Sequence, residues 1–357
     1  MSDHIDILYA DAIDVLSALI SIPSFSREEE GTAACLYNFL LQKGVDAKRT
    51  GNNVYAINKH FNPAKPSILL NSHHDTVKPN AGYTKDPFAP QVEDGKLYGL
   101  GSNDAGGCLV SLMMTFLHYY NDENLAYNLV FAATAEEEIS GTNGIQLALK
   151  ELPQIDFALV GEPTLLQMAV AERGLMVVDC KAVGVAGHAA REEGVNAIYK
   201  AMMDIEWLCC HQFERVSELL GPVKMSITSI ETANKAHNVV PADCRFVVDV
   251  RVNELYSLEE VLAIIRENVQ CETTPRSLRL KSSSISLDHP IVKAGSSLGK
   301  TYYGSPTTSD KALMPYPALK IGPGDSARSH TADEFIFLHE IKEGIELYIQ
   351  LLKQVLL

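Results

Sequence analysis

Three short apolar runs in the first half of the chain place the strongest constraint on its fold. They span residues 67–72, 128–133 and 157–160, and they are apolar almost throughout rather than at every second position. Stretches of helical character, near 105–119 and 143–151, separate them. Near-continuous apolar strands that alternate with helices predict a largely parallel sheet with both faces covered, and therefore an α/β domain.

Helices are expected at both ends of this α/β part. Residues 5–20 carry apolar side chains at helical spacing, and a C-terminal helix is expected over 340–356. A second helix is expected to begin at a Ser26 cap, with the acidic residues 28–30 in its first turn. It should end at Gly44, because glycine favours the conformation that terminates a helix.

The middle of the chain has a different pattern. Strand-like runs and helices follow one another in the order β-α-β-β-α-β, which is the ferredoxin-like split arrangement. The expected strands are 175–183, 223–231, 243–251 and 276–284. The expected helices are 195–216 and one that begins at the capping box Ser257–Glu260. We therefore expect a first domain at 1–173 and 287–357, interrupted by an inserted α+β domain at 174–286.

Composition excludes several classes of partner and location. The formal net charge of −15 argues against nucleic acid or an anionic membrane as a partner, because both require a basic surface. The seven cysteines include no CxxC pair, which argues against a disulfide framework or a cysteine zinc site. The N-terminal segment lacks the features of a signal peptide, and no apolar run is as long as a membrane span. A cytoplasmic protein is therefore expected.

Polar clusters follow the three apolar runs directly. His73–Asp75 follows the first run, Glu136–Glu138 follows the second, and Glu162 follows the third. In an open parallel sheet the carboxyl ends of the strands converge on one crevice. We therefore expect these groups, distant in the sequence, to meet in space.

Two glycine-rich loops add further candidates. Residues 99–107 contain Asp104, and residues 322–330 end at His330. Each polar group by itself also has a structural interpretation, as a surface pair, a solvated charged face or an Asx turn. Together they supply two imidazoles and several carboxylates, which is a donor set that suits zinc or another divalent transition ion.

These motifs resemble those of a hydrolase family that includes acetylornithine deacetylase, succinyl-diaminopimelate desuccinylase, aminoacylase and glutamate carboxypeptidase. The resemblance extends over nearly the whole chain and rests on His73–Val77, Asp104 in Gly-Ser-Asn-Asp, Ala135–Glu138 and Gly161–Thr164. It implies a zinc-exopeptidase-like catalytic domain with an inserted ferredoxin-like domain for dimerisation or as a lid. In one departure, alanine follows Asp104 where the family usually carries a lysine.

The resemblance implies a role for each residue of the polar clusters. Two Zn²⁺ ions, for which Co²⁺ or Mn²⁺ can substitute, would be held by His73, Asp104, Glu138, Glu162 and His330. Asp104 would bridge the two ions. Glu137 would be the general base, an assignment that a slip of one residue in the glutamate triplet would change. Asp75 would hydrogen-bond the far nitrogen of His73 and orient its ring.

The resemblance also implies substrate contacts from the inserted domain. His188, in a Gly-x-x-Gly-His segment, would donate to the reacting oxygen across the interface of a homodimer. Asn238 would contact the substrate, and Arg251 could hold a substrate carboxylate with two hydrogen bonds. Thr308, which follows the inserted domain, lies in a segment that resembles a substrate-side loop of the family. A turn histidine and a surface arginine are the competing interpretations of His188 and Arg251.

The activity implied is hydrolysis of the amide bond of a small N-acyl amino acid. The short chain and the Gly-Glu-Pro-Thr segment resemble the acetylornithine deacetylase branch, which implies arginine biosynthesis and N-acetyl- or N-succinyl-ornithine or citrulline as substrate. The alternatives are a succinyl-diaminopimelate desuccinylase or lysine-pathway deacetylase, a dipeptidase, a tripeptidase and a carboxypeptidase. A non-catalytic metal-binding protein on the same fold is the alternative from another class.

Overall fold

The computed structural model describes residues 2–191 and 193–357, which form two compact units. The first unit contains the residues up to Val170 together with Ser284–Tyr303 and Ser309–Leu357. The second contains Ala171–Ser283 and the short segment Gly304–Thr308. The division expected at 174 and 286 differs from this one by a few residues at each boundary. It also leaves out the return of the chain to the second unit at Gly304.

The first unit is built on one nine-stranded sheet, whose central strands are parallel. The strand order is β1-β2-β6-β3-β7-β17-β8-β15, with β16 paired to β8, and the neighbours β6, β3, β7 and β17 run parallel to one another. Their bounds are β1 Ala47–Thr50, β2 Asn53–Ile57, β3 Ser67–His73, β6 Asn128–Thr134, β7 Phe157–Val160, β8 Met168–Glu172, β15 Ser283–Ser284, β16 Tyr302–Ser305 and β17 Ala318–Lys320. A smaller sheet joins β4 Gln91–Glu93, β5 Lys96–Tyr98 and β18 Phe335–Phe337. The predicted α/β class is confirmed.

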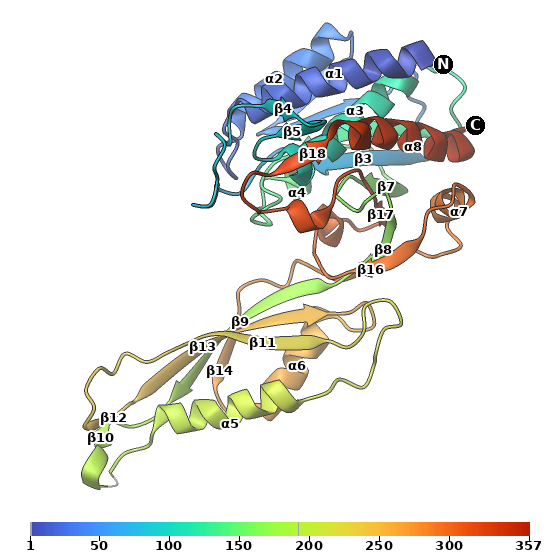
Figure 1. Ribbon diagram of the computed structural model, residues 1–357. Helices are drawn as coiled ribbons and strands as arrows, with labels where there is room; N and C mark the ends of the chain where they lie inside the picture. The colour runs from blue at the N-terminus through green and yellow to red at the C-terminus, as the bar shows by residue number, and fades with distance from the viewer. Residues whose placement is uncertain (1, 192) are drawn as a thin grey trace. The chain divides into compact units, whose positions relative to one another are not determined.

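The apolar runs are continuous because both faces of the central strands are buried. In β3, Ile68 and Leu70 pack into one core with α1, α2, α3 and α8, whereas Leu69 packs into a second core with α4. Figure 1 shows α1, α2, α3 and α8 on the same side of the sheet. The helices are α1 Ser2–Ile20, α2 Glu30–Gln42, α3 Gly107–Tyr119, α4 Ile145–Ala148, α7 Pro290–Ser297 and α8 Leu338–Leu356.

Two helix predictions in the first unit are wrong in detail. The α2 helix begins at Glu30 rather than after Ser26, because the Ser26 hydroxyl donates to the Asp75 carboxylate at 2.6 Å and does not cap a helix. The α4 helix is a single turn, shorter than the expected 143–151. The residues before α4 contact a buried glutamate instead, since the Asn143 side chain donates to Glu136 at 2.9 Å.

The second unit has the predicted β-α-β-β-α-β order. Its strands β9, β11, β13 and β14 form an antiparallel sheet in the order β11-β13-β9-β14, and α5 and α6 pack their apolar faces on it. The capping box is confirmed, because Ser257 and Glu260 exchange hydrogen bonds of 2.7 and 3.1 Å at the start of α6. The bounds are β9 Gly174–Val183, β10 Gly187–His188, α5 Ala197–Cys210, β11 Lys224–Glu231, β12 Val239–Val240, β13 Asp243–Val252, α6 Leu258–Asn268 and β14 Glu272–Pro275.

Two boundaries in the second unit differ from the prediction. The α5 helix ends at Cys210 instead of near 216, and the chain then turns so that Phe213 enters the core. The last strand of this sheet is β14, which pairs with β9, whereas the expected strand 276–284 contributes only β15, in the larger sheet. Just before β14, the Asp204 carboxylate accepts the N–H groups of Gln270 and Cys271 at 2.9 and 3.0 Å. No helix in the described parts of the chain has the length and apolar content needed to cross a bilayer.

Candidate active site

The candidate ligands lie where four neighbouring parallel strands end. Strand β3 ends at His73, β6 ends two residues before Glu136, and β7 ends two residues before Glu162. Strand β17 leads into the glycine-rich loop that reaches His330. Because neighbouring parallel strands point the same way, all four deliver their side chains to one edge of the sheet.

His73 is at the centre of this edge, and its side chain is 1% exposed. Its Nδ1 atom lies 2.9 Å from the Asp75 carbonyl oxygen and 3.4 Å from Asp75 Oδ1. Its Nε2 atom faces three carboxylates, at 3.4 Å from Asp104, 3.9 Å from Glu137 and 3.9 Å from Glu162. Burial opposes a charge on this ring, yet the carboxylates of Asp104 and Asp75 raise the pKa of His73 well above its ordinary value.

Asp75 connects His73 to the glutamate triplet. Its buried carboxylate accepts the Ser26 hydroxyl at 2.6 Å, the Glu137 N–H at 3.0 Å and the Glu138 N–H at 3.2 Å. Burial alone would raise the pKa of this carboxyl, but the hydrogen bond from His73 lowers it below its ordinary value. The position of the two glutamates therefore depends on the same residue that contacts His73 Nδ1, which it does through its carbonyl oxygen at 2.9 Å and its carboxylate at 3.4 Å.

The three glutamates have different surroundings. The Glu136 side chain turns away from the edge and accepts the side chain and the N–H of Asn143, at 2.9 and 3.2 Å. Glu138 lies 3.0 Å from His330 Nε2. Burial raises the pKa of Glu137 well above its ordinary value, although His73 acts in the opposite direction. Because Glu136 is used locally, only Glu137 and Glu138 are available to the site.

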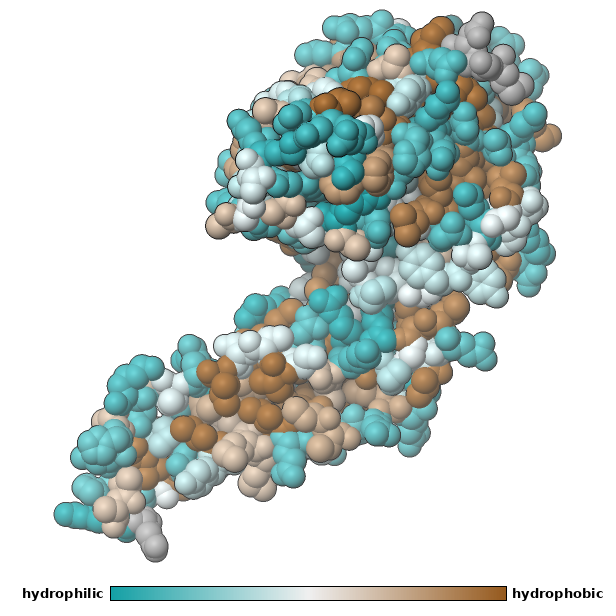
Figure 2. Space-filling view, viewed as in Figure 1, coloured by the Kyte–Doolittle hydropathy of each residue, from teal (hydrophilic) through white to brown (hydrophobic). Residues whose placement is uncertain are grey.

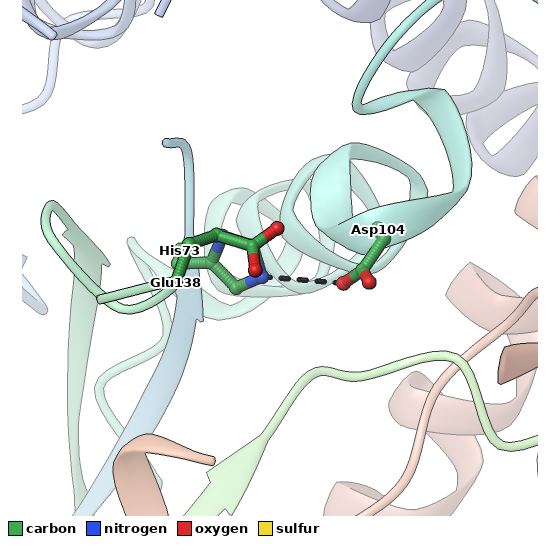
Figure 3. A group of neighbouring side chains, drawn as sticks. All are labelled: His73, Asp104 and Glu138. Carbon is green, nitrogen blue, oxygen red and sulfur yellow. Dashed lines mark hydrogen bonds and ion pairs between the residues drawn. The ribbon is translucent and has the colours of Figure 1, made fainter. Parts of the chain in front are cut away.

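Asp104 lies between the two histidines. Its Oδ1 atom is 3.4 Å from His73 Nε2, and its Oδ2 atom is 3.6 Å from His330 Nε2. Figure 3 shows the first of these contacts as a dashed line, with Glu138 beside the imidazole. The hydrogen bond from His330 to Glu138 raises the pKa of His330 to about 9.

The donor atoms form two overlapping groups that fit metal ions. His73, Asp104 and Glu138 make up one group, and His73, Glu137 and Glu162 the other; within each group the donor atoms lie within 4.8 Å of one another. A set of imidazoles and carboxylates matches the chemistry of zinc. Several carboxylates packed at one buried edge also repel one another, and cations between them offset this repulsion.

The four substrate-contact candidates of the second unit separate into two pairs. His188 in β10 is exposed and is registered opposite Val239, beside Asn238. Arg251 lies near the other end of β13, where the Asp249 carboxylate accepts from it at 2.8 and 3.1 Å. The Thr308 hydroxyl donates to the Arg173 carbonyl at 3.0 Å, also at that end. The structure therefore brings His188 to Asn238 and Arg251 near Thr308, but it does not unite the pairs within one unit.

Comparison with known proteins identifies the family. The model of peptidase family M20/M25/M40 matches residues 69–354, which is most of the chain. The chain belongs to this family. Its membership confirms the predicted resemblance and makes hydrolysis of an amide bond its class of reaction.

The individual relatives within the M20 family have low sequence identity to the chain. The chain is 28% identical over 264 residues to the succinyl-diaminopimelate desuccinylase of Cereibacter sphaeroides, and the match covers 69% of each protein. Among solved structures, aminopeptidase PepT of Bacillus cereus has a TM-score of 0.78 at 17% identity and 97% and 98% coverage. The YXEP protein of Bacillus subtilis, described as a dinuclear metal-binding peptidase, has a TM-score of 0.73 at 15% identity and covers 97% and 98%. The two structures establish a shared M20 fold.

Two buried carboxylates at this M20 site were missed by sequence reasoning. Asp310 accepts the Thr134 hydroxyl at 2.7 Å, and burial raises its pKa to about 6. Glu334 accepts N–H groups of the loop around Asp104, and burial raises its pKa to about 8. Both lie next to turns, and Glu334 directly follows another acidic residue, Asp333, so sequence alone does not distinguish them from surface residues. The only available signal was their closeness in the chain to Thr308 and His330.

Proposed function

We propose that this protein is a two-zinc hydrolase that cleaves the amide bond of an N-acyl amino acid. The observation that carries the proposal is the position of Asp104 between His73 and His330, with one carboxylate oxygen toward each ring. A carboxylate that faces two histidines in this way is suited to be a ligand shared by two cations. Paired cations of this kind are usually about 3.5–4 Å apart.

The remaining ligands are then assigned by their nearest histidine. Glu162 is 3.9 Å from His73 and would complete the first site. Glu138 is 3.0 Å from His330 and would complete the second. When bound, the two cations supply Lewis acidity, which polarises the amide carbonyl and acidifies the attacking water.

Glu137 is the proposed general base. It shares the edge with the ligands, and burial raises the pKa of its carboxyl well above the ordinary value, which is the direction that favours accepting a proton from water. It would take a proton from the attacking water and transfer the same proton to the leaving amine. Asp75 would keep the glutamate loop and the His73 ring in position through its hydrogen bonds.

The relatives favour one alternative for the substrate. The chain is similar to a succinyl-diaminopimelate desuccinylase, which favours that substrate over the N-acylornithine of arginine biosynthesis. We therefore propose N-succinyl-diaminopimelate as the first substrate to test, with a peptide as the second, because one structural neighbour is an aminopeptidase. The cytoplasm remains the proposed location.

A homodimer is proposed because one copy of the second unit does not bring its candidate substrate contacts together. His188 and Asn238 lie at the end of the unit where β13 begins, at Asp243. Arg251 lies eight residues further along this extended strand, which corresponds to about 27 Å. A small substrate does not span that distance. We propose that His188 and Asn238 act on the substrate bound by a second copy, whereas Arg251 and Thr308 act on the substrate of their own copy.

The surface of the second unit has a suitable contact face. Strand β11 is an edge strand of its sheet, and an unpaired strand edge can pair with a second copy. On α5, the side chains of Tyr199, Met202 and Met203 are 67%, 57% and 67% exposed. Figure 2 shows apolar side chains gathered over α5 and β11. Met203→Asp should shift sedimentation from dimer to monomer; an unchanged dimer would exclude this face.

The test of the activity combines metal replacement with a substrate panel. Chelation should abolish hydrolysis, and Zn²⁺ or Co²⁺ should restore it. The panel contains N-succinyl- and N-acetyl-ornithine, citrulline, lysine and diaminopimelate, together with di- and tripeptides. A preference for succinyl-diaminopimelate would support the proposed substrate, whereas a preference for N-acetylornithine would restore the arginine interpretation. An active protein without bound metal would refute the proposal.

A further inference from the structure

A buried glutamate holds the loop that carries Asp104. Glu334 is 2% exposed, and its Oε1 atom accepts the N–H groups of Asn103 and Asp104, both at 2.9 Å. Its Oε2 atom accepts the N–H of Gly101 at 3.2 Å, and its carbonyl oxygen accepts that of Gly99 at 3.0 Å. One residue therefore satisfies four N–H groups of the glycine-rich loop, in a region with little access to water.

The same C-terminal segment holds the loop from a second side. The Asn103 side chain donates to the Asp325 carbonyl at 3.0 Å and accepts the Asp325 N–H at 3.0 Å. Asp325 and Glu334 lie on either side of His330 in the sequence. The segment that carries His330 is therefore hydrogen-bonded to the segment that carries Asp104, although the two are more than 200 residues apart in the chain.

We propose that Glu334 is a positioning residue of the metal centre, which holds Asp104 so that each of its oxygens faces one cation. This proposal rests on the proposed two-zinc function. A shared ligand must satisfy two sites at once, so a small displacement of the Asp104 backbone would lengthen one ligand bond as it shortens the other. The N–H of Asp104 itself is bonded to Glu334, which leaves little freedom for such a displacement.

The geometry requires a carboxylate at position 334. The donors approach both oxygens, since Gly101 approaches Oε2 whereas Asn103 and Asp104 approach Oε1. Glutamine has nearly the same size but only one acceptor oxygen, so Glu334→Gln loses the bond to Gly101. Aspartate keeps both oxygens but is one methylene shorter, which draws its oxygens away from the loop.

The experiment measures metal binding by itself, without substrate. Metal-free wild type and Glu334→Gln are titrated with Zn²⁺ against a chromophoric chelator, and Co²⁺ absorption spectra report the ligand geometry. Loss of a group that orients a ligand usually weakens metal affinity about 10–100-fold. We expect a loss of this size for at least one of the two ions, together with a changed Co²⁺ spectrum.

A matched control separates positioning from general destabilisation. Asp204 is also a buried carboxylate that accepts two backbone N–H groups, but it lies in the second unit. Asp204→Asn should lower thermal stability and leave both zinc affinities unchanged. If Glu334→Gln does not fold, Glu334→Asp is measured in the same assay with the same expectation.

The outcomes distinguish this inference from the proposed function. A wild type that binds no metal would refute the two-zinc function itself. A wild type that binds two ions, with a position-334 variant of equal affinity and unchanged Co²⁺ spectrum, would overturn only the role of Glu334. An equal loss of affinity in Asp204→Asn would overturn it as well, because the effect would then reflect stability alone.

Discussion

Asp75→Asn tests whether one buried carboxylate organises the site. The Asp75 carboxylate accepts three hydrogen bonds, from the Ser26 hydroxyl at 2.6 Å and from the N–H groups of Glu137 and Glu138 at 3.0 and 3.2 Å. Glu137 approaches Oδ1, whereas Glu138 approaches Oδ2, as does Ser26. Asparagine has the same shape but a single acceptor oxygen, so it can hold only one of the two backbone groups.

The size of the effect follows from these contacts. One buried N–H group left without a partner costs about 1–3 kcal/mol. The remaining N–H bond changes from a charged to a neutral acceptor, which costs about 1 kcal/mol more. The Ser26 hydroxyl can turn to accept from the new amide, so it adds little. We therefore expect Asp75→Asn to lower the free energy of unfolding by about 2–4 kcal/mol.

The assay is urea denaturation of the metal-free protein at pH 7, with Ser26→Ala as the matched control. Ser26→Ala removes one bond to the carboxylate and keeps both backbone contacts, so it should cost about 1 kcal/mol. The folded-state pKa of Asp75 lies below 3.8, so its contribution is present above that pH and is lost as the pH falls through the folded-state value. If Asp75→Asn is no more destabilising than Ser26→Ala at pH 7, the carboxylate does not hold the glutamate loop.

Three further predictions concern the neighbouring side chains. Glu137→Gln should lower kcat about 10²–10⁴-fold and leave the zinc content at two per chain, because a general base is removed but no proposed ligand; loss of one zinc would instead make Glu137 a ligand. His330→Gln should weaken one zinc only, by competition titration, since this ring contacts Glu138 and Asp104 but not His73. Burial raises the pKa of Asp310 to about 6 in the folded state. Its protonated form therefore stabilises the fold below pH 3.8, and this contribution is lost as the pH rises through 6. Asp310→Asn should therefore raise the thermal unfolding temperature of the metal-free protein more at pH 8 than at pH 4.5, and an equal change at both would contradict the buried-charge explanation.

The parallel sheet was predictable because strands buried on both faces appear in the sequence as continuous apolar runs. Ile68, Leu69 and Leu70 are consecutive apolar residues because successive side chains enter different cores. Strand direction then places His73 and Glu162 at one edge without any knowledge of distances. The prediction was wrong for 276–284, because pairing with β9 takes the residues just before this run, 272–275, into β14.

The residues that hold the ligands in place have no comparable pattern in the sequence. The three consecutive residues 136–138 are all glutamates. Only the folded chain shows that the Glu136 side chain accepts from Asn143 and that the Glu136 N–H donates to Glu29. Glu334 likewise follows another acidic residue, Asp333, and only the folded chain shows that Glu334 is buried against a loop more than 200 residues earlier. The proposed ligands were recognisable because they directly follow apolar strands or lie in glycine-rich loops. A residue that supports a ligand uses ordinary chemistry, and its role arises from long-range contacts that no local pattern encodes.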